Sequence, residues 1–180
     1  LVTYNTSFSV KAYEDMYFWS AQYTRLDKNM TTFGVVYDDA TVMNFHGDFG
    51  LLFRKVNFVA NFDYYLWQLQ NEEEAWYKPI VDISLASRFN IVNPNTNKTK
   101  LTIEPRLYYK LFQADPAGGD IGKTDVVDLG IEANYYYSSI FQIFLDVNNI
   151  LNWNGHYNGY PLQGINFLIG ASFSFGGHKE

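Results

Sequence analysis

Apolar and polar residues alternate along most of this chain. In residues 127–135 every odd position is apolar or aromatic, whereas the even positions are Asp128, Gly130, Glu132 and Asn134. Because successive side chains of a β-strand point to opposite faces of the sheet, this period of two predicts strands with one apolar and one polar face. A helical period of about 3.6 is almost absent, so the pattern predicts an all-β protein.

The alternation predicts nine strands, at residues 2–13, 16–26, 41–53, 56–67, 79–92, 99–112, 126–137, 140–150 and 165–175. Each range is at least about as long as the roughly 9–11 residues that a tilted strand needs to cross a bilayer. Charges on the polar faces, such as Arg106 and Glu132, would be costly in a dry sandwich core but are well solvated on the wall of a wet lumen. The sequence therefore predicts antiparallel, up-and-down transmembrane β-barrel strands.

The predicted connections alternate between short and long. The short ones are expected at Glu14–Asp15, Arg54–Lys55, 93–98 and Ser138–Ser139, and the long ones at 27–40, 68–78, 113–125 and 151–164. This asymmetry is typical of bacterial outer-membrane barrels, with short periplasmic turns and long extracellular loops. Residues 32–37 are an alternative strand extension inside the first long loop. An odd strand count predicts that at least one strand precedes Leu1, because such barrels have an even number of strands.

The amino-acid composition narrows the class of protein further. Aromatic residues make up 19% of the chain, with 15 Tyr, 15 Phe and 4 Trp, which suits strands that cross a lipid–water boundary. The absence of cysteine excludes disulfides, thiolate catalysis and Cys-based metal sites. A net charge of -6 argues against nucleic-acid binding, which needs a basic surface. Leu1 opens directly into strand-like sequence, so a signal peptide was removed or was never part of this piece.

Three segments near the C-terminus resemble the closing region of TonB-dependent receptors. They are residues 144–152 (Phe-Leu-Asp-Val-Asn-Asn-Ile-Leu-Asn), 158–167 (Asn-Gly-Tyr-Pro-Leu-Gln-Gly-Ile-Asn-Phe) and 170–175 (Gly-Ala-Ser-Phe-Ser-Phe). The resemblance implies a large barrel of about 22 strands that encloses an N-terminal plug. Residues 1–175 would be its C-terminal barrel portion, and residues 176–180 a short tail beyond the usual aromatic end. Further upstream, residues 36–39 and 76–79 resemble a subgroup from anaerobic Gram-negative bacteria.

This resemblance also implies a location, partners and a function. The protein would lie in the outer membrane of a Gram-negative bacterium, in contact with lipid and lipopolysaccharide. The plug and the TonB complex would act through the missing N-terminal part, and the barrel-assembly machinery would recognise Phe175, although the tail after it departs from the family. The implied activity is the import of a scarce nutrient, such as an iron chelate, cobalamin, a glycan or a peptide. The resemblance implies no enzyme activity and no cofactor.

Aromatic residues supply the candidate sites. Trp153, Tyr157 and Tyr160 in the last long connection are candidates for stacking on an extracellular ligand. Two interfacial girdles are also expected, one of Tyr13, Tyr17, Trp19, Tyr135, Tyr136, Tyr137 and Phe141 beside short turns, and one of Trp67, Trp76, Tyr77, Trp153, Tyr157 and Tyr160 at the opposite end. Ordinary enrichment of strands in aromatic residues is the simpler alternative.

Charged residues offer weaker candidates. Glu104, Glu132, Asp128 and Asp146 would share the lumen wall, where solvated charge or contact with a plug is expected rather than the paired carboxylates of a hydrolase. His46 near Asp48 and Asp63 suggests a barrel lipase or protease, but no serine stands in a recognisable nucleophile setting. Asp38, Asp39 and Asp120 are oxygen donors that a cation would accept, without the spacing of a known site.

Two other functions stay open. A non-transporting outer-membrane barrel with a structural or interaction role would show the same alternation. A soluble ligand-binding β-barrel or sandwich would differ by remaining in the aqueous phase without detergent.

Overall fold

The computed structural model describes residues 1–22, 32–73, 75–93, 98–113, 125–154, 156–157, 160–161 and 163–174, and the protein is all-β over these ranges. Eight strands form the main sheet: β1 (Val2–Gln22), β2 (Thr32–Leu52), β3 (Val56–Leu69), β4 (Pro79–Val92), β5 (Thr99–Phe112), β6 (Asp125–Tyr136), β7 (Phe141–Asn148) and β10 (Asn166–Phe173). Two short strands, β8 (His156–Tyr157) and β9 (Tyr160–Pro161), pair separately. No described segment is a helix of the length and apolarity needed to span a bilayer.

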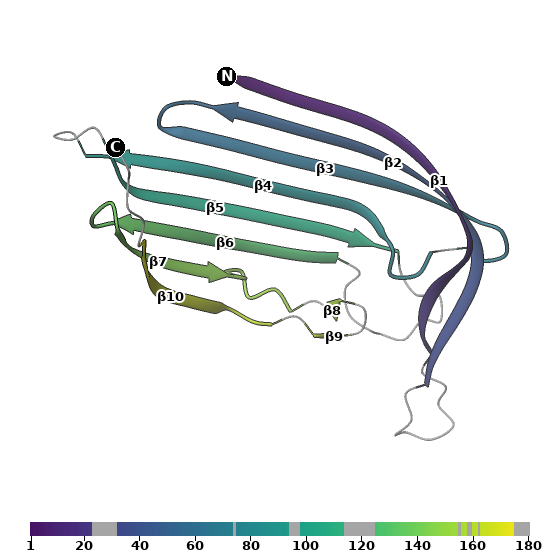
Figure 1. Cartoon of the computed structure of the whole chain (residues 1–180). Coiled ribbons are helices and arrows are strands. Elements are labelled where there is room, and N and C mark those ends of the chain that lie inside the picture. Colours follow the sequence, from purple (N-terminus) through teal and green to yellow (C-terminus); the bar gives the residue numbers. More distant parts are fainter. Residues whose placement is uncertain are drawn as a thin grey trace.

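The sheet follows chain order. Its strands run β1-β2-β3-β4-β5-β6-β7-β10, and every neighbouring pair is antiparallel. Figure 1 shows them side by side in one curved layer. This confirms the predicted class, an antiparallel up-and-down sheet that fits part of a larger barrel.

The predicted count of nine strands is wrong, because the first two predicted strands are one. Glu14 and Asp15 do not form a turn: the register with β2 shifts between Tyr13 and Met16, and Asp15 has a φ of 50°. This is a β-bulge, which keeps the strand running while it bends. Residues 32–37 belong to β2, so the shorter gap at 23–31 replaces the predicted loop at 27–40.

The corrected count changes which end of the sheet holds the start of β1. The Leu1 amino group donates to the Leu52 carbonyl at 3.0 Å, beside the short β2–β3 turn. The last described residue lies at the same edge, because the Ser174 amide donates to the Ile140 carbonyl of the short β6–β7 turn at 2.9 Å. The argument for a preceding strand from an odd count is therefore wrong.

The predicted sorting of connections survives this correction. The strand ends that are joined by the short connections 53–55, 93–98 and 137–140 lie at the edge where β1 begins. The strand ends that are joined by the longer connections 23–31, 70–78, 113–124 and 149–165 lie at the opposite edge (Figure 1). We call these the short-turn edge and the long-loop edge.

The two faces of the sheet differ as the alternation predicts. One face carries rows of aromatic and aliphatic side chains. Phe8, Phe45 and Tyr64 on neighbouring strands form one such row, with ring centroids 4.7 Å apart between Phe8 and Phe45 and 6.5 Å apart between Phe45 and Tyr64. Much of this face is open, and Phe167 on β10 is 74% exposed. A continuous exposed apolar surface of this kind marks contact with lipid or with another protein.

Phe144 breaks the alternation, and the structure explains why. It lies on the polar face of β7 opposite Gly170 of β10. A Cβ at Gly170 would lie only 2.5 Å from the Phe144 Cζ atom, so the ring covers the glycine. Glycine therefore makes room for an aromatic ring that shields the backbone of the neighbouring strand.

We expect Gly170→Ala to destabilise the β7–β10 pairing by about 1–3 kcal/mol, because the ring has to shift. Gly47→Ala is the matched control, since a Cβ there meets nothing within 4 Å. Denaturant unfolding in lipid vesicles measures both. Equal effects of the two substitutions, or a Gly170→Ala cost that persists in the Phe144→Ala background, would contradict this explanation.

Candidate functional site

Arg106 is the centre of a charge network on the polar face. Its Nη1 atom lies 3.2 Å from the Glu132 carboxylate on β6, and its Nη2 atom donates to Asp146 on β7. The guanidinium thus crosses the width of β6 above Gly130, the register partner of Arg106. A side chain at Gly130 would also collide with the Asn148 amide oxygen, 2.9 Å from an added Cβ. Glycine is therefore required where the arginine and its partners converge.

Replacing Arg106 with methionine is expected to cost about 1 kcal/mol at low ionic strength, because the three side chains are 26–34% exposed and water screens the charges. Most of that cost should disappear in 0.5 M salt. Urea unfolding in vesicles at two salt concentrations measures it. Arg106→Lys is the control that retains the charge without the forked donor geometry. A cost independent of salt would show that packing, not charge, is lost.

Two further ion pairs join neighbouring strands on this face. Lys110 Nζ lies 2.6 Å from the Asp82 carboxylate, and Arg88 Nε lies 2.6 Å from Glu104. Glu104, Glu132 and Asp146 are successive register partners on β5, β6 and β7, as predicted for one wall. Arginine contacts to all three carboxylates favour a neutralised polar wall over an acid–base pair.

His46 lies between two carboxylates, as the sequence suggested. Its Nε2 atom is 2.9 Å from Asp48, and its Nδ1 atom is 2.9 Å from Asp63. Ser7 is its register partner on β1. Both ring nitrogens face acceptors, so this geometry suits an imidazolium that donates twice. A general base needs a nitrogen lone pair directed at the nucleophile, so the arrangement does not fit a lipase or protease triad.

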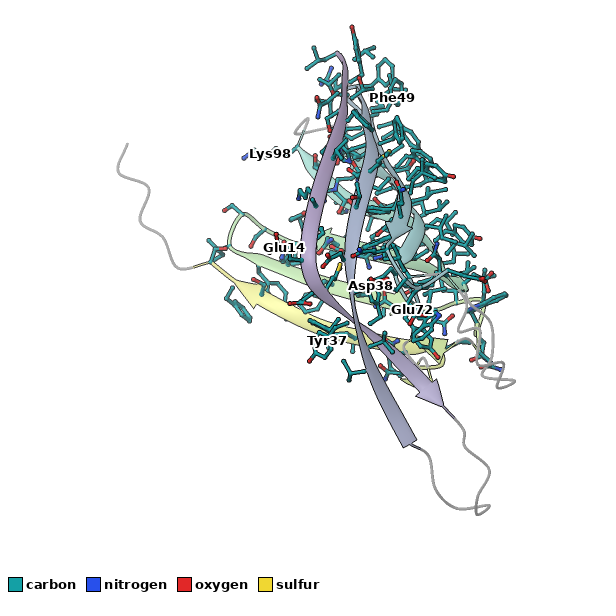
Figure 2. All side chains as sticks on the ribbon, turned by 90° about the vertical axis from the view of Figure 1, so that its right-hand side faces the viewer. Glu14, Tyr37, Asp38, Phe49, Glu72 and Lys98 are labelled. Atoms are coloured by element: carbon teal, nitrogen blue, oxygen red, sulfur yellow. The ribbon has the colours of Figure 1, made fainter. Side chains whose placement is uncertain are left out.

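A second assembly lies at the long-loop edge and centres on Asp38. This carboxylate is 3% exposed. It accepts hydrogen bonds from the backbone amides of Asn71 and Glu72 at 2.8 and 2.9 Å, from the Asn71 side chain at 2.8 Å, and from the Asp39 amide at 2.9 Å. Figure 2 shows Asp38 and Glu72 close together at this edge. We call this assembly the Asp38 joint.

Asp39 extends the Asp38 joint to β1. Its carboxylate accepts a hydrogen bond from the Asp15 amide at the bulge, at 3.0 Å. The oxygens proposed for a cation are therefore engaged by N–H donors, which favours a structural role over metal binding. Within the described ranges, no group of three or more His, Asp or Glu side chains has an arrangement that could hold a metal ion, and Asp120 lies outside these ranges.

A small hydrophobic core lies beside the Asp38 joint. It contains Phe18, Ala40, Ala75 and Trp76, all buried. The Lys78 ammonium lies 5.3 Å and 5.4 Å from the ring centroids of Tyr17 and Phe18. Partial burial lowers the pKa of Lys78, and the electron-rich ring faces favour its charged form. This core packs the extension of β1 and β2 against the β3–β4 connection.

Asn149 organises the connection that follows β7. It is 5% exposed and has a φ of 50°. Its amide group donates to the carbonyls of Trp153 and Gln163 at 3.2 and 2.8 Å and accepts from the Trp153 backbone amide at 2.8 Å. Its own backbone amide donates to Asp128 at 2.7 Å. The Asn149 side chain therefore joins the two ends of the loop, and its backbone amide attaches them to β6.

The structure describes only part of the residues that were predicted to bind a ligand. Trp153 is half-buried, and its indole N–H points at the Asp125 carbonyl at 3.4 Å, so it is anchored to β6. Tyr157 and Tyr160 are register partners in the β8–β9 ladder, so the backbone brings them together. Their side chains, and all of Phe175, lie outside the described part of the chain.

The girdle predictions have mixed outcomes. Tyr135, Tyr137 and Phe141 do lie at the short-turn edge. Tyr17 is wrongly placed by the prediction, because the supposed turn is a bulge and Tyr17 lies beside Lys78 of the β3–β4 connection. Trp76 is buried in the core rather than exposed at an interface.

The comparisons agree with this architecture. The copper transporter OprC matches 97% of this chain with a TM-score of 0.70 and 13% sequence identity, over 29% of its own length. The siderophore receptor PirA from Acinetobacter baumannii matches 97% with a TM-score of 0.65 and 15% identity, over 30% of its length. Both are TonB-dependent receptors, so the resemblance of the closing motifs is confirmed at the level of the fold.

This likeness covers part of those proteins only. The chain spans less than one-third of either solved structure, at 29% and 30%. No family model and no curated protein matches the sequence.

Proposed function

We propose that this chain is the C-terminal barrel portion of a TonB-dependent outer-membrane transporter that imports a scarce nutrient into a Gram-negative bacterium. The observation that carries the proposal is the fold match to OprC and PirA over 97% of the chain. The paired charges of the polar face suit a wet lumen, and the open apolar face suits lipid. The sorting of short and long connections supports a position of the long-loop edge at the cell exterior.

The rest of the proposed machinery lies outside this portion. A plug would fill the lumen and contact the polar face, and the TonB complex would supply energy through the N-terminal part. Residues 1–175 would form barrel wall, with residues 176–180 as a tail. The barrel-assembly machinery would recognise Phe175, so Phe175→Ala should reduce the amount of folded protein in the outer membrane, and Phe173→Ala is the neighbouring aromatic control.

Uptake by cells that carry the full-length protein tests the transport function. The panel should contain ferric chelates, cobalamin, glycans, peptides and copper, because the two similar proteins carry different cargo names. Uptake of one ligand that stops with a protonophore supports an energy-coupled importer. Absence of uptake for every ligand of the panel, with the full-length protein inserted in the outer membrane, would favour a non-transporting barrel. A full-length protein that stays in the aqueous phase without detergent would overturn both readings.

The loop aromatics are the proposed contacts for the ligand. Tyr157→Ala with Tyr160→Ala should raise the Kd of the imported ligand by roughly tenfold or more, since each stacked ring contributes about 1 kcal/mol. Leu151→Ala, an exposed residue of the same connection, is the control. Unchanged affinity in the double variant would remove these tyrosines from the ligand site.

A further inference from the structure

An open hollow lies on the short-turn edge, between the β4–β5 and β6–β7 turns. Its volume is about 700 Å³, and its lining includes Lys98, Lys100, Tyr135, Tyr137, Ser138 and Ser139. Two lysines and several residues with hydroxyl groups therefore line one concave surface. Hydroxyls and ammonium groups are donors suited to phosphate oxygens.

A bulge directs Lys100 into this hollow. In the pairing of β4 with β5, Val92 faces Thr99 and Ile91 faces Leu101, so Lys100 is the extra residue. A bulge changes the direction of a side chain relative to the regular alternation. The Lys100 ammonium accordingly lies 5.6 Å from the ring centroid of Tyr135, on the apolar face of β6.

Lys98 adds a second cation on the same rim. It is exposed and extends away from the ribbon into open space (Figure 2). Neither Lys98 nor Lys100 takes part in an ion pair among the described side chains, whereas Arg88, Arg106 and Lys110 on the polar face are paired. The rim cations are thus available to an external anion.

An apolar surface begins directly beside these cations. Tyr137 lies edge-on to Phe141 with ring centroids 6.2 Å apart, and Phe141 stacks on Phe173 at 4.6 Å. Ile140 and Phe173 are 58% and 59% exposed. A ligand that fits both surfaces has an anionic head and a hydrocarbon chain that continues along the strands.

We propose that this hollow binds the headgroup of an anionic phospholipid, with the phosphate held by Lys98 and Lys100 and an acyl chain lying over Phe141 and Phe173. The proposal rests on the membrane location proposed above and names the lipid contact at its short-turn edge. The aromatic rings mark the depth of the interface, and the lysines select for negative charge.

Native mass spectrometry of the full-length protein, released from membranes that contain equal amounts of phosphatidylglycerol and phosphatidylcholine, tests this site. We expect retention of phosphatidylglycerol in preference to phosphatidylcholine. Lys98→Gln with Lys100→Gln should reduce this preference by roughly twenty-five-fold, about fivefold for each lysine near a charged lipid surface. Lys55→Gln, on the β2–β3 turn of the same edge, is the control and should change it little.

The outcomes separate this site from the transport proposal. If the double lysine variant retained phosphatidylglycerol with the same preference, the lipid site would be overturned, even when the protein is inserted and transports its ligand. Loss of the preference on adding millimolar inorganic phosphate would assign the hollow to free phosphate instead of lipid. Tyr137→Phe provides a second variant that leaves both charges in place, and a severalfold loss there supports a hydroxyl contact to the headgroup. Protein that never partitions into membranes would overturn the transport proposal itself.

Discussion

Replacing Asp38 with alanine is expected to destabilise the long-loop edge by about 3 kcal/mol, because the amides of Asn71 and Glu72 lose their buried carboxylate acceptor. Hydrogen exchange measures this directly. The protection of these two amides should fall by roughly two orders of magnitude, since about 1.4 kcal/mol corresponds to a factor of ten. The strands near the short-turn edge should keep their protection.

Two control variants separate charge, hydrogen bonding and position in the Asp38 joint. Asp38→Asn retains one acceptor oxygen and should lose part of the protection. Asp39→Ala removes an exposed neighbouring carboxylate whose side chain accepts from the Asp15 amide. We expect its effect at Asn71 and Glu72 to be small. Equal loss in Asp38→Ala and Asp39→Ala would show that general disturbance of β2, not the buried acceptor, controls the joint.

Replacing Asn149 with alanine is the second large expected effect, about 2–4 kcal/mol of local stability. The substitution leaves the Trp153 amide and two carbonyls without their partner. Alanine also lacks the short polar side chain that lets asparagine adopt the left-handed backbone conformation, here a φ of 50°. We expect the Trp153 amide to exchange much faster and proteases to cut the connection between β7 and β10.

Asn152 offers a matched control for the backbone part of this effect. Its φ is 49°, but its side chain is exposed. Asn152→Ala should therefore cost about 1 kcal/mol, the strain alone. Asn149→Gly relieves the strain and removes the hydrogen bonds, so it should remain severely destabilised. If Asn149→Gly were as stable as the native protein, the hydrogen bonds of the Asn149 side chain would contribute nothing to local stability.

The fold was accessible from the sequence because its signal is local and repeated. A period of two depends only on the opposite directions of neighbouring side chains, and it identified the faces of β6, β7 and β10 without knowledge of their partners. Phe144 was the exception to the alternation, and only its partner Gly170 explains it. The partner lies on another strand, so no local pattern contains it.

The strand count failed for a similar reason. The adjacent charges of Glu14 and Asp15 interrupt the alternation in the way that a turn does. In the structure, Asp39 on the neighbouring strand accepts a hydrogen bond from the Asp15 amide, and the strand continues through a bulge. A turn and a bulge differ in which groups form hydrogen bonds with the backbone amides and carbonyls. Here the hydrogen-bond partner is a residue distant in sequence.

The sequence alone determined that this protein is all-β, that each strand has a polar and an apolar face, and that its loops sort by length. These properties follow from residue order within single strands. Only the tertiary structure decided that Arg106 crosses β6 to Asp146, that Asp38 closes the β3–β4 connection, and that Lys100 turns toward Tyr135. Such contacts join residues up to 40 positions apart. They depend on the register between strands and on bulges, which the packing of the whole sheet sets and which no single segment encodes.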